Sequence, residues 1–226
     1  TFVALVVPDS VQMTPAAAFL VLILAQFAIA MFVLILVQER AEQRLIALTE
    51  TDSLTGIRNR HWMMDRLPRE APVGSAYVII DIDHFKQVND RLGHLAGDEV
   101  LTSVAQAMTR QLGRNAILAR MGGEEFGLYL PAANEADAMQ TAQQLCASIA
   151  ALTIFHEGTK IAVTLSAGVA VAPTAMSIMQ LIGRADEALY AAKRGGRNRV
   201  VLARFEPAAH DMRLPEVDVP LVANPV

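Results

Sequence analysis

The segment AYVIIDID, residues 76–83, joins a run of apolar, mostly β-branched side chains to two carboxylates. A short apolar run of this kind predicts a buried strand over residues 76–82. Asp81 and Asp83 then stand at the end of that strand, where a domain built on a sheet can expose polar groups. The fold and the chemistry therefore both depend on what surrounds this segment.

Strand and helix patterns alternate on its C-terminal side. Apolar side chains at helical spacing predict helices over 95–112, 134–152 and 177–193. Short apolar runs predict strands over 116–121, 126–130, 161–172 and 200–202. The order β-α-β-β-α-β predicts an α+β, ferredoxin-like sandwich, in which helices cover one face of an antiparallel sheet.

A second pair of carboxylates, Glu124 and Glu125, lies between the two strands of the predicted hairpin. In this topology the first strand lies against the hairpin, so both acidic pairs should meet at one place on the sheet. Like charges repel there unless a cation compensates them. Mg²⁺ held by one or two carboxylates and substrate phosphates is one solution. The alternative is a set of solvated turn acids, each offset by a nearby Lys or Arg.

Other polar groups fit a nucleotide. Gly122-Gly123 lets backbone approach a ligand closely, although such a pair is often only a turn. The cations of Lys193 and Arg197 suit phosphates, or else they pair with the helix dipole. An amide and a carboxylate suit the donors of a guanine edge, and we expect these on Asn89 in a loop and Asp98 at a helix start. Asp98 could also be a plain helix-terminus acid.

The N-terminal part of the chain is far more apolar than the rest. Residues 16–37 are apolar except for Gln26, which is long enough for a transmembrane helix. A buried core helix and a signal peptide are the alternatives, and both fit the run less well. Lys and Arg are absent from residues 1–15 and follow the run at Arg40 and Arg44, which predicts a cytoplasmic domain after the run. Residues 1–15 would then be a non-cytoplasmic segment or the end of a truncated earlier region.

The remaining segments are connections. Residues 38–51 have apolar side chains at helical spacing and predict a juxtamembrane linker helix. Residues 205–226 contain four prolines without periodicity and predict a disordered tail.

Composition excludes several classes of protein. With 226 residues and a formal net charge of −4, the chain lacks the basic surface of a non-specific nucleic-acid binder. Its single cysteine, Cys146, excludes an intrachain disulfide and a cysteine-rich zinc site. The five histidines have no metal-ligand spacing.

Five segments, in order and with matching separations, resemble the GGDEF family of diguanylate cyclases: DSLTGIRNR (52–60), DIDHFKQVNDRLGHLAGD (81–98), RMGGEEF (120–126), SAGVA (166–170) and ADEALYAAKRGGRNR (185–199). The resemblance implies a cyclase domain over residues 52–204 with a palm-type fold. It also implies that two GTP are condensed into cyclic di-GMP with release of pyrophosphate. The third motif position is Glu rather than the Asp of the family name, and the family accepts either.

The resemblance also implies residue roles. Metal ligands would be Asp81, Glu124 and the carbonyl of Ile82, holding Mg²⁺ with Mn²⁺ as an alternative. Guanine would bind Asn89 and Asp98. Phosphates would bind the backbone at His84 and Phe85, with Gly123, Lys86, Lys193 and Arg197. Glu125 is required by the motif, as a base or as a substrate contact. Asp83 would support the site, and residues 52–60 would join the incoming helix to the domain.

Regulation and assembly follow from the same resemblance. Catalysis would need a homodimer in which each protomer holds one GTP, anchored in the inner membrane of a bacterium by residues 16–37. Many relatives carry an R-x-x-D site for product inhibition, but Gly113 and Ala116 occupy those positions here, with Arg114 out of register. We therefore expect no inhibition through that site. The rival readings are a catalytically silent nucleotide sensor or scaffold, and an anchored domain that only dimerises.

Overall fold

The computed structural model describes residues 14–48 and 50–205. Contacts divide the chain into a unit that ends at Glu50 and a unit that begins at Thr51. Most of the predicted segments 1–15 and 205–226 lie outside the described residues.

The first unit is one continuous helix, α1 (Pro15–Leu48). Its part Pro15–Arg40 is long and apolar enough to cross a membrane, and none of its most apolar window is buried. Exposure of so many apolar side chains to water is unfavourable, so this surface requires contact with lipid or with another apolar surface. Membrane insertion remains a prediction. The linker predicted over residues 38–51 is a helix that continues directly from the apolar part, because α1 runs without a break to Leu48, before residue 51.

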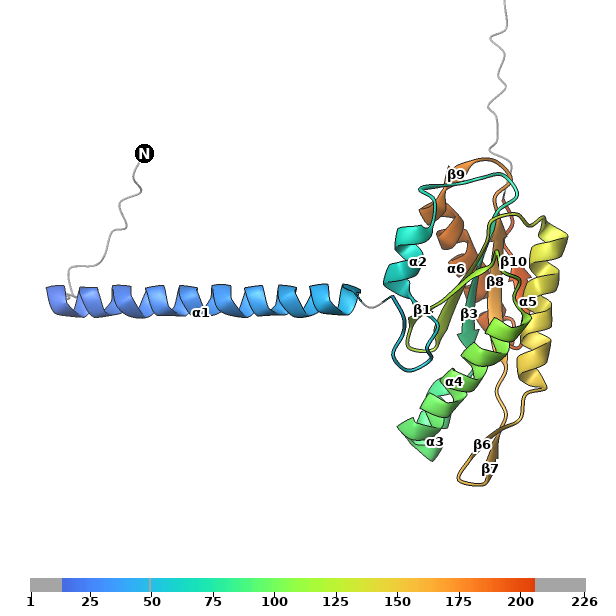
Figure 1. Ribbon diagram of the computed structural model, residues 1–226, viewed down its shortest axis with the longest axis horizontal. Helices are drawn as coiled ribbons and strands as arrows, with labels where there is room; N and C mark the ends of the chain where they lie inside the picture. Colours follow the sequence, from blue (N-terminus) through green and yellow to red (C-terminus); the bar gives the residue numbers. More distant parts are fainter. Residues whose placement is uncertain (1–13, 49, 206–226) are drawn as a thin grey trace, which may run out of the picture. The chain divides into compact units, whose positions relative to one another are not determined.

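The second unit is built on a six-stranded sheet of order β1-β4-β5-β3-β8-β10 (Figure 1). The strands in that order are Arg58–Asn59, Ile117–Gly122, Glu125–Leu130, Ala76–Ile82, Leu165–Val171 and Val200–Leu202. Strand β3 pairs antiparallel with β5 and β8, whereas β1 with β4 and β10 with β8 are parallel pairs. The predicted hairpin strands are confirmed within about a residue of their ends. The wholly antiparallel sheet is wrong, because a helix between β8 and β10 returns the chain in the same direction.

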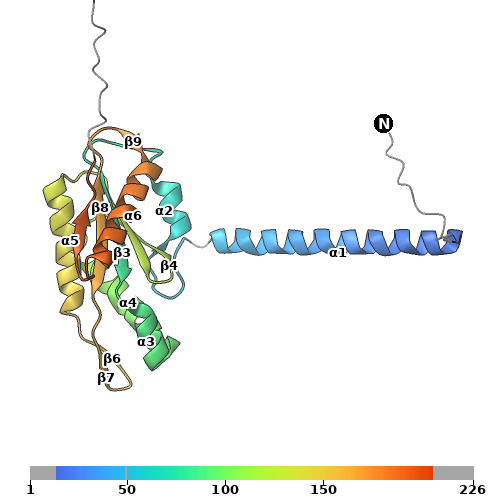
Figure 2. The ribbon, with the colours of Figure 1, turned by 180° about the vertical axis from the view of Figure 1, so that it is seen from behind.

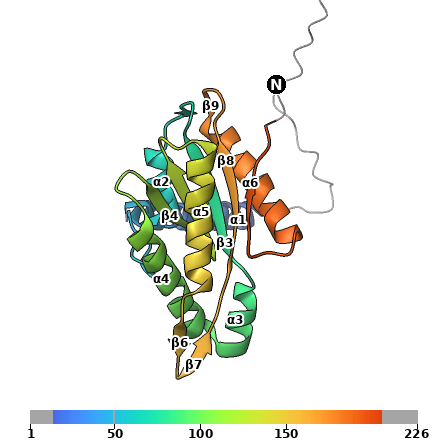
Figure 3. The ribbon, with the colours of Figure 1, turned by 90° about the vertical axis from the view of Figure 1, so that its right-hand side faces the viewer.

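Helices cover both faces of the sheet, which corrects the prediction of one covered face. Figure 2 shows α2 (Arg60–Arg66) and α6 (Ile178–Arg194) on one face, and Figure 3 shows α4 (His94–Gln111) and α5 (Glu135–Ala150) on the other. Two apolar cores result, one on each side. The physical reason lies in β3, where six of seven residues are buried, at odd and even positions alike.

The remaining elements are short. Helix α3 (Phe85–Leu92) follows β3, and two small two-stranded sheets pair β2 (Glu70–Ala71) with β9 (Met176–Ser177) and β6 (Ile154–His156) with β7 (Thr159–Ile161). The long strand predicted over 161–172 is therefore two elements. Strand β7 ends at Ile161, opposite the first residue of β6, and β8 begins only at Leu165.

Gly168 lets α6 pack directly on β8. A Cβ at this position would overlap the Ala185 carbonyl oxygen and the Leu189 nitrogen, and backbone atoms cannot move aside as a side-chain tip can. We expect Gly168→Ala to lower the free energy of unfolding by about 3 kcal/mol.

Urea unfolding of the full chain measures this effect. Gly183→Ala is the matched control, because Gly183 lies inside α6 with open space at its Cβ position. That variant should gain about 0.5–1 kcal/mol from helix propensity. Equal stabilities for the two variants would contradict the close packing of α6 on β8.

Candidate active site

The two acidic pairs meet at the end of β3, as the sequence predicts. Asp81 is paired in register with Glu125 of β5. The Ile82 N–H donates to the Glu124 carbonyl oxygen at 3.3 Å, which holds the turn of the β4–β5 hairpin beside the strand end. The Ile82 side chain is buried in the core, so only its backbone is available to a ligand.

Asp81 projects toward the face covered by α6. Its carboxylate is almost fully buried and receives Lys193 Nζ from the last turn of α6 at 2.7 Å. Burial raises the pKa of Asp81, and the charges of Lys193 and Arg197 oppose that rise. Lys193 and Arg197, the two cations that the sequence suggests for phosphates, therefore both act on the Asp81 carboxylate.

Glu124 completes the cluster from the hairpin turn. Burial raises the pKa of Glu124, the charges of Asp81 and Glu125 raise it further, and Lys193 lowers it. This mutual repulsion is what a bound cation would relieve. Glu125 itself is exposed at the start of β5.

The donors at this point fit a magnesium ion that also binds a substrate. They are two carboxylates and a strand-end carbonyl, all hard oxygen ligands. No cluster of three or more His, Cys, Asp or Glu suited to a metal occurs among residues 14–48 and 50–205. A small set of protein ligands is the arrangement that Mg²⁺ adopts when phosphates supply the rest.

Arg120 braces the glycine turn of the hairpin. The turn uses backbone that favours glycine, with φ of 145° at Gly122 and 51° at Gly123. Arg120 donates through Nε and Nη2 to the Gly123 carbonyl at 3.0 and 2.8 Å, and through Nη1 to Asp52 at 3.0 Å.

Asp52 is the other end of this brace. Burial alone would raise the pKa of Asp52, but hydrogen bonds from Thr55 and the contact with Arg120 outweigh it and lower the pKa. Sequence reasoning singled out neither the role of Arg120 nor its contact with Asp52, although both residues lie inside motif segments. The start of the domain is thereby tied directly to the turn that carries Glu124.

The predicted guanine ligands lie where α3 meets α4. Asn89 is in α3 rather than in a loop, which corrects the prediction, and Asp98 is in the second turn of α4. A Cβ on Gly97 would overlap Asn89 Oδ1, so the Asn89 side chain lies directly against the backbone next to Asp98. The Asn89 amide thus lies against the residue that precedes Asp98 in α4.

The β3–α3 turn carries the remaining predicted phosphate ligands. His84 adopts a left-handed conformation with φ of 58°, which turns the chain into α3. Phe85 is buried in the core, and Lys86 is exposed on the first helical turn. The backbone at His84 and Phe85 is therefore held firmly, whereas Lys86 is placed at the surface.

Gly97 sets the position of Asn89, and this can be measured. We expect Gly97→Ala to displace the Asn89 amide and to raise the KM for the predicted substrate, GTP, about tenfold, with a smaller change in kcat. Steady-state kinetics of the full chain check the result. Gly113→Ala is the control, since its Cβ position is open. Unchanged KM in Gly97→Ala would remove Asn89 from the substrate site.

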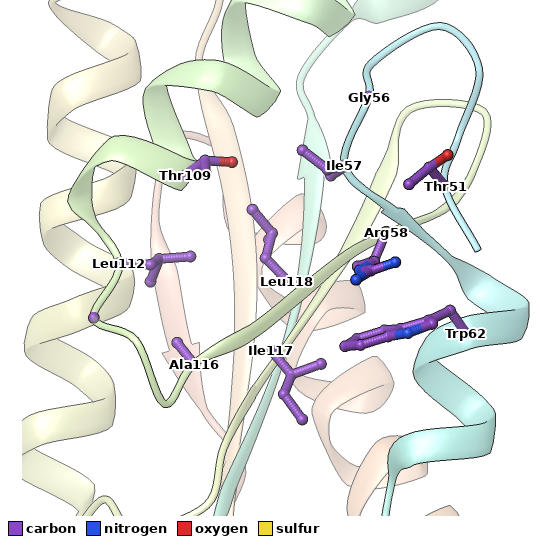
Figure 4. A pocket seen from close by; sticks show the side chains of 11 residues that line it. Thr51, Gly56, Ile57, Arg58, Trp62, Thr109, Leu112, Ala116, Ile117 and Leu118 are labelled. Atoms are coloured by element: carbon purple, nitrogen blue, oxygen red, sulfur yellow. The ribbon is translucent and has the colours of Figure 1, made fainter.

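A separate cavity of about 620 Å³ lies at the β1–β4 edge of the sheet (Figure 4). Trp62 lines it, with the Arg58 guanidinium 4.5 Å from the ring centroid. Gly113 and Ala116 also line it, and none of the residues at the end of β3 does. The positions that would carry an R-x-x-D pair therefore offer this cavity no charged side chain.

Comparison with known proteins gives the domain its relatives. The family described as diguanylate cyclase, GGDEF domain, matches residues 49–199. The chain is 39% identical over 168 residues to diguanylate cyclase DgcP of Pseudomonas aeruginosa, covering 72% of this chain and 25% of that protein. It is 38% identical over 165 residues to response regulator PleD of Caulobacter vibrioides, covering 69% and 36%. The chain thus spans about a quarter to a third of these curated relatives.

Solved structures agree. The GGDEF domain of DgcB from Caulobacter crescentus, in complex with c-di-GMP, has a TM-score of 0.63 at 34% identity, covering 69% of this chain and 96% of that one. The active GGEEF domain of a diguanylate cyclase from Vibrio cholerae has a TM-score of 0.54 at 33% identity, covering 64% and 90%. Since the family match extends over more than half of the chain, the chain belongs to the GGDEF family of diguanylate cyclase domains.

Proposed function

We propose that this chain is an active diguanylate cyclase that condenses two GTP into cyclic di-GMP and two pyrophosphates. The observation that carries the proposal is the cluster at the end of β3. There the Asp81 carboxylate, the Glu124 carboxylate and the Lys193 ammonium converge from a strand, a hairpin and a helix. This cluster lies inside the segment that matches the cyclase family.

Each predicted group has a task at the triphosphate. Asn89 and Asp98 would accept hydrogen bonds from the guanine edge. Lys193, Arg197 and the backbone of the β3–α3 turn would hold the phosphates. Asp81, Glu124 and the Ile82 carbonyl would hold Mg²⁺, with Mn²⁺ as an alternative. When bound, such an ion neutralises charge that develops on the phosphoryl oxygens.

The reaction needs two copies of the domain. The ribose 3′-OH of one GTP attacks the α-phosphate of the other, the bond to pyrophosphate breaks, and the hydroxyl proton leaves with the departing group or solvent. The 3′-OH of the second GTP then attacks the α-phosphate of the first, which releases the second pyrophosphate and closes the ring. Because each protomer holds one GTP, ring closure requires that two sites face each other. Lys193 and Arg197 would stabilise the negative charge that develops on the departing pyrophosphate.

The N-terminal helix would supply anchoring and proximity. With residues 16–37 in the bilayer and Arg40 and Arg44 after them, the cyclase domain would lie on the cytoplasmic side of a bacterial inner membrane. Confinement of two chains to one membrane raises their effective concentration, which favours the dimer.

The Glu at position 124 keeps a carboxylate where the family name has Asp, and activity is expected.

Incubation of the full chain in detergent with GTP and Mg²⁺, with nucleotides separated by chromatography, tests the proposal. Cyclic di-GMP as the product supports it. Bound but unconverted GTP would favour the alternative, a silent nucleotide sensor or scaffold. A chain that neither binds nor converts GTP would remove both readings and leave a domain that only dimerises.

Product inhibition through the R-x-x-D positions should be absent. Gly113 and Ala116 provide no cation and no carboxylate, so initial rates should change by less than about twofold as cyclic di-GMP rises to a hundred micromolar. The double variant Gly113→Arg, Ala116→Asp is the positive control and should gain inhibition. Micromolar inhibition of the parent would contradict this prediction.

A further inference from the structure

The loop that follows α6 is held to the domain at consecutive backbone positions. The Arg197 N–H donates to the Ala192 carbonyl at 3.1 Å, and the Arg197 carbonyl accepts from Arg199 Nε at 3.0 Å. The Arg199 carbonyl accepts from the Ala167 N–H at 2.9 Å. Arg197 and Asn198 have φ of 62° and 45°, a left-handed conformation that non-glycine residues keep only where their surroundings enforce it.

Asp83 makes the remaining backbone contact. Its Oδ2 accepts from the Asn198 N–H at 2.9 Å and from Thr164 Oγ1 at 2.6 Å, and its Oδ1 accepts from Ser166 Oγ at 2.6 Å. Asp83 is only 4% exposed. None of the ion pairs formed by the described residues includes it. A buried carboxylate without a cation depends on such hydrogen bonds, so these donors form a site built around Asp83.

The anchored loop carries a cation close to the candidate active site. The Arg197 N–H is hydrogen-bonded to the Ala192 carbonyl, next to Lys193 in the chain, and the charge of Arg197 lowers the pKa of Asp81 at the end of β3. Lys193, one turn earlier on the chain, contacts Asp81 directly. Asp81 and Asp83 thus hold the two cations in different ways, the first by an ion pair and the second through the backbone beside Arg197.

We propose that Asp83 is a positioning residue that fixes Arg197 for the phosphates of GTP by binding the Asn198 N–H. The proposal rests on the proposed function, because it assigns Arg197 to the substrate. Loss of the Asp83 carboxylate frees the strained backbone at Arg197 and Asn198 to relax. The cost then falls on phosphate contacts and not on guanine contacts, which come from α3 and α4 on other parts of the domain.

Selectivity between a triphosphate and a monophosphate reports this directly. The probes are 3′-deoxy-GTP, which lacks the attacking hydroxyl, and 3′-deoxy-GMP, each titrated with Mg²⁺ into the full chain in detergent. Asp83→Ala should weaken the binding of 3′-deoxy-GTP about tenfold and the binding of 3′-deoxy-GMP less than about twofold. In an Arg197→Ala background, Asp83→Ala should weaken 3′-deoxy-GTP less than about twofold further, because the two residues act as one unit.

Two further variants separate positioning from general destabilisation. Ser166→Ala removes a hydrogen bond to Asp83 Oδ1 and leaves the Asn198 contact, so it should lower the unfolding temperature without changing selectivity. Asp83→Asn should keep most of the triphosphate affinity, because its amide oxygen can accept from the Asn198 N–H and Thr164 Oγ1, as Oδ2 of Asp83 does, while the Ser166 hydroxyl can accept from its amide nitrogen. Equal weakening of both probes, or additive effects of Asp83→Ala and Arg197→Ala, overturns the proposal.

Hydrogen exchange provides a readout that does not depend on GTP. Asp83→Ala should accelerate amide exchange in the loop at residues 195–199 about tenfold, while exchange in the middle of α6 stays unchanged. Unchanged exchange in the loop overturns the anchor. A parent chain that fails to bind 3′-deoxy-GTP, yet shows the accelerated loop in Asp83→Ala, overturns the proposed function and leaves the anchor standing.

Discussion

Glu124→Gln should lower the rate of cyclic di-GMP formation by about three orders of magnitude. The substitution keeps the size and hydrogen-bonding shape of the side chain and removes its negative charge. The charge of Asp81 raises the pKa of Glu124, because the two carboxylates are close enough to repel each other. A bound cation would relieve this repulsion and allow both carboxylates to be ionised. In the proposed mechanism, loss of one of the two carboxylates prevents the site from holding the divalent ion and the phosphates in the reactive arrangement.

The control is Glu187→Gln, which removes a carboxylate from the exposed face of α6. Glu187 pairs with Arg184 at 3.0 Å, and both side chains are well exposed, so its loss should leave turnover within about twofold of the parent. Thermal unfolding of both variants shows whether the fold is intact. A folded Glu124→Gln variant with parental turnover would refute the assignment of Glu124 to the metal.

Lys193→Ala should lower both activity and stability. It removes a proposed phosphate ligand and leaves the Asp81 carboxylate, with 6% of its side chain exposed, without its partner. Breaking a buried pair from one side is costly, and the partial exposure of Lys193 moderates the cost to about 2 kcal/mol of the free energy of unfolding. Arg184→Ala, which breaks an exposed pair on the same helix, should cost less than about 0.5 kcal/mol.

The cost of Lys193→Ala should depend on pH. Burial places the pKa of Asp81 above its ordinary value of 3.8, so ionisation of Asp81 favours the unfolded chain. The stability that this group contributes is therefore complete below pH 3.8 and declines as the pH rises through the folded-state pKa. Removing Lys193 raises that pKa further. Urea unfolding from pH 3 to pH 7 should show the two proteins converging at the acid end, and a constant difference would contradict the ion pair.

The sequence predicts the order of elements in the cyclase domain well. The apolar run before Asp81 and the hairpin around Gly122 leave few alternatives, because strand ends and the glycine turn are local features. What the sequence does not determine is which faces of the sheet are covered. Strand β3 is apolar at both odd and even positions, and that pattern permits helices on both faces.

The candidate site is predicted in part. Carboxylates and cations near motif glycines can be found by residue type, and the structure brings Asp81, Glu124 and Lys193 together. The hydrogen bonds that support them cannot be found in this way. Arg120 reaches Asp52 across 68 positions, and Asp83 reaches Asn198 across 115, so only the folded chain reveals these partners.

The stoichiometry of the products tests the central claim most directly. The full chain in detergent is supplied with GTP and Mg²⁺, and pyrophosphate and cyclic di-GMP are measured in the same sample. Two protomers that each transfer one nucleotidyl group should release two pyrophosphates for every cyclic di-GMP, and Glu124→Gln should release neither. GTP consumed to GDP and inorganic phosphate, or GTP bound and left intact, would contradict the account.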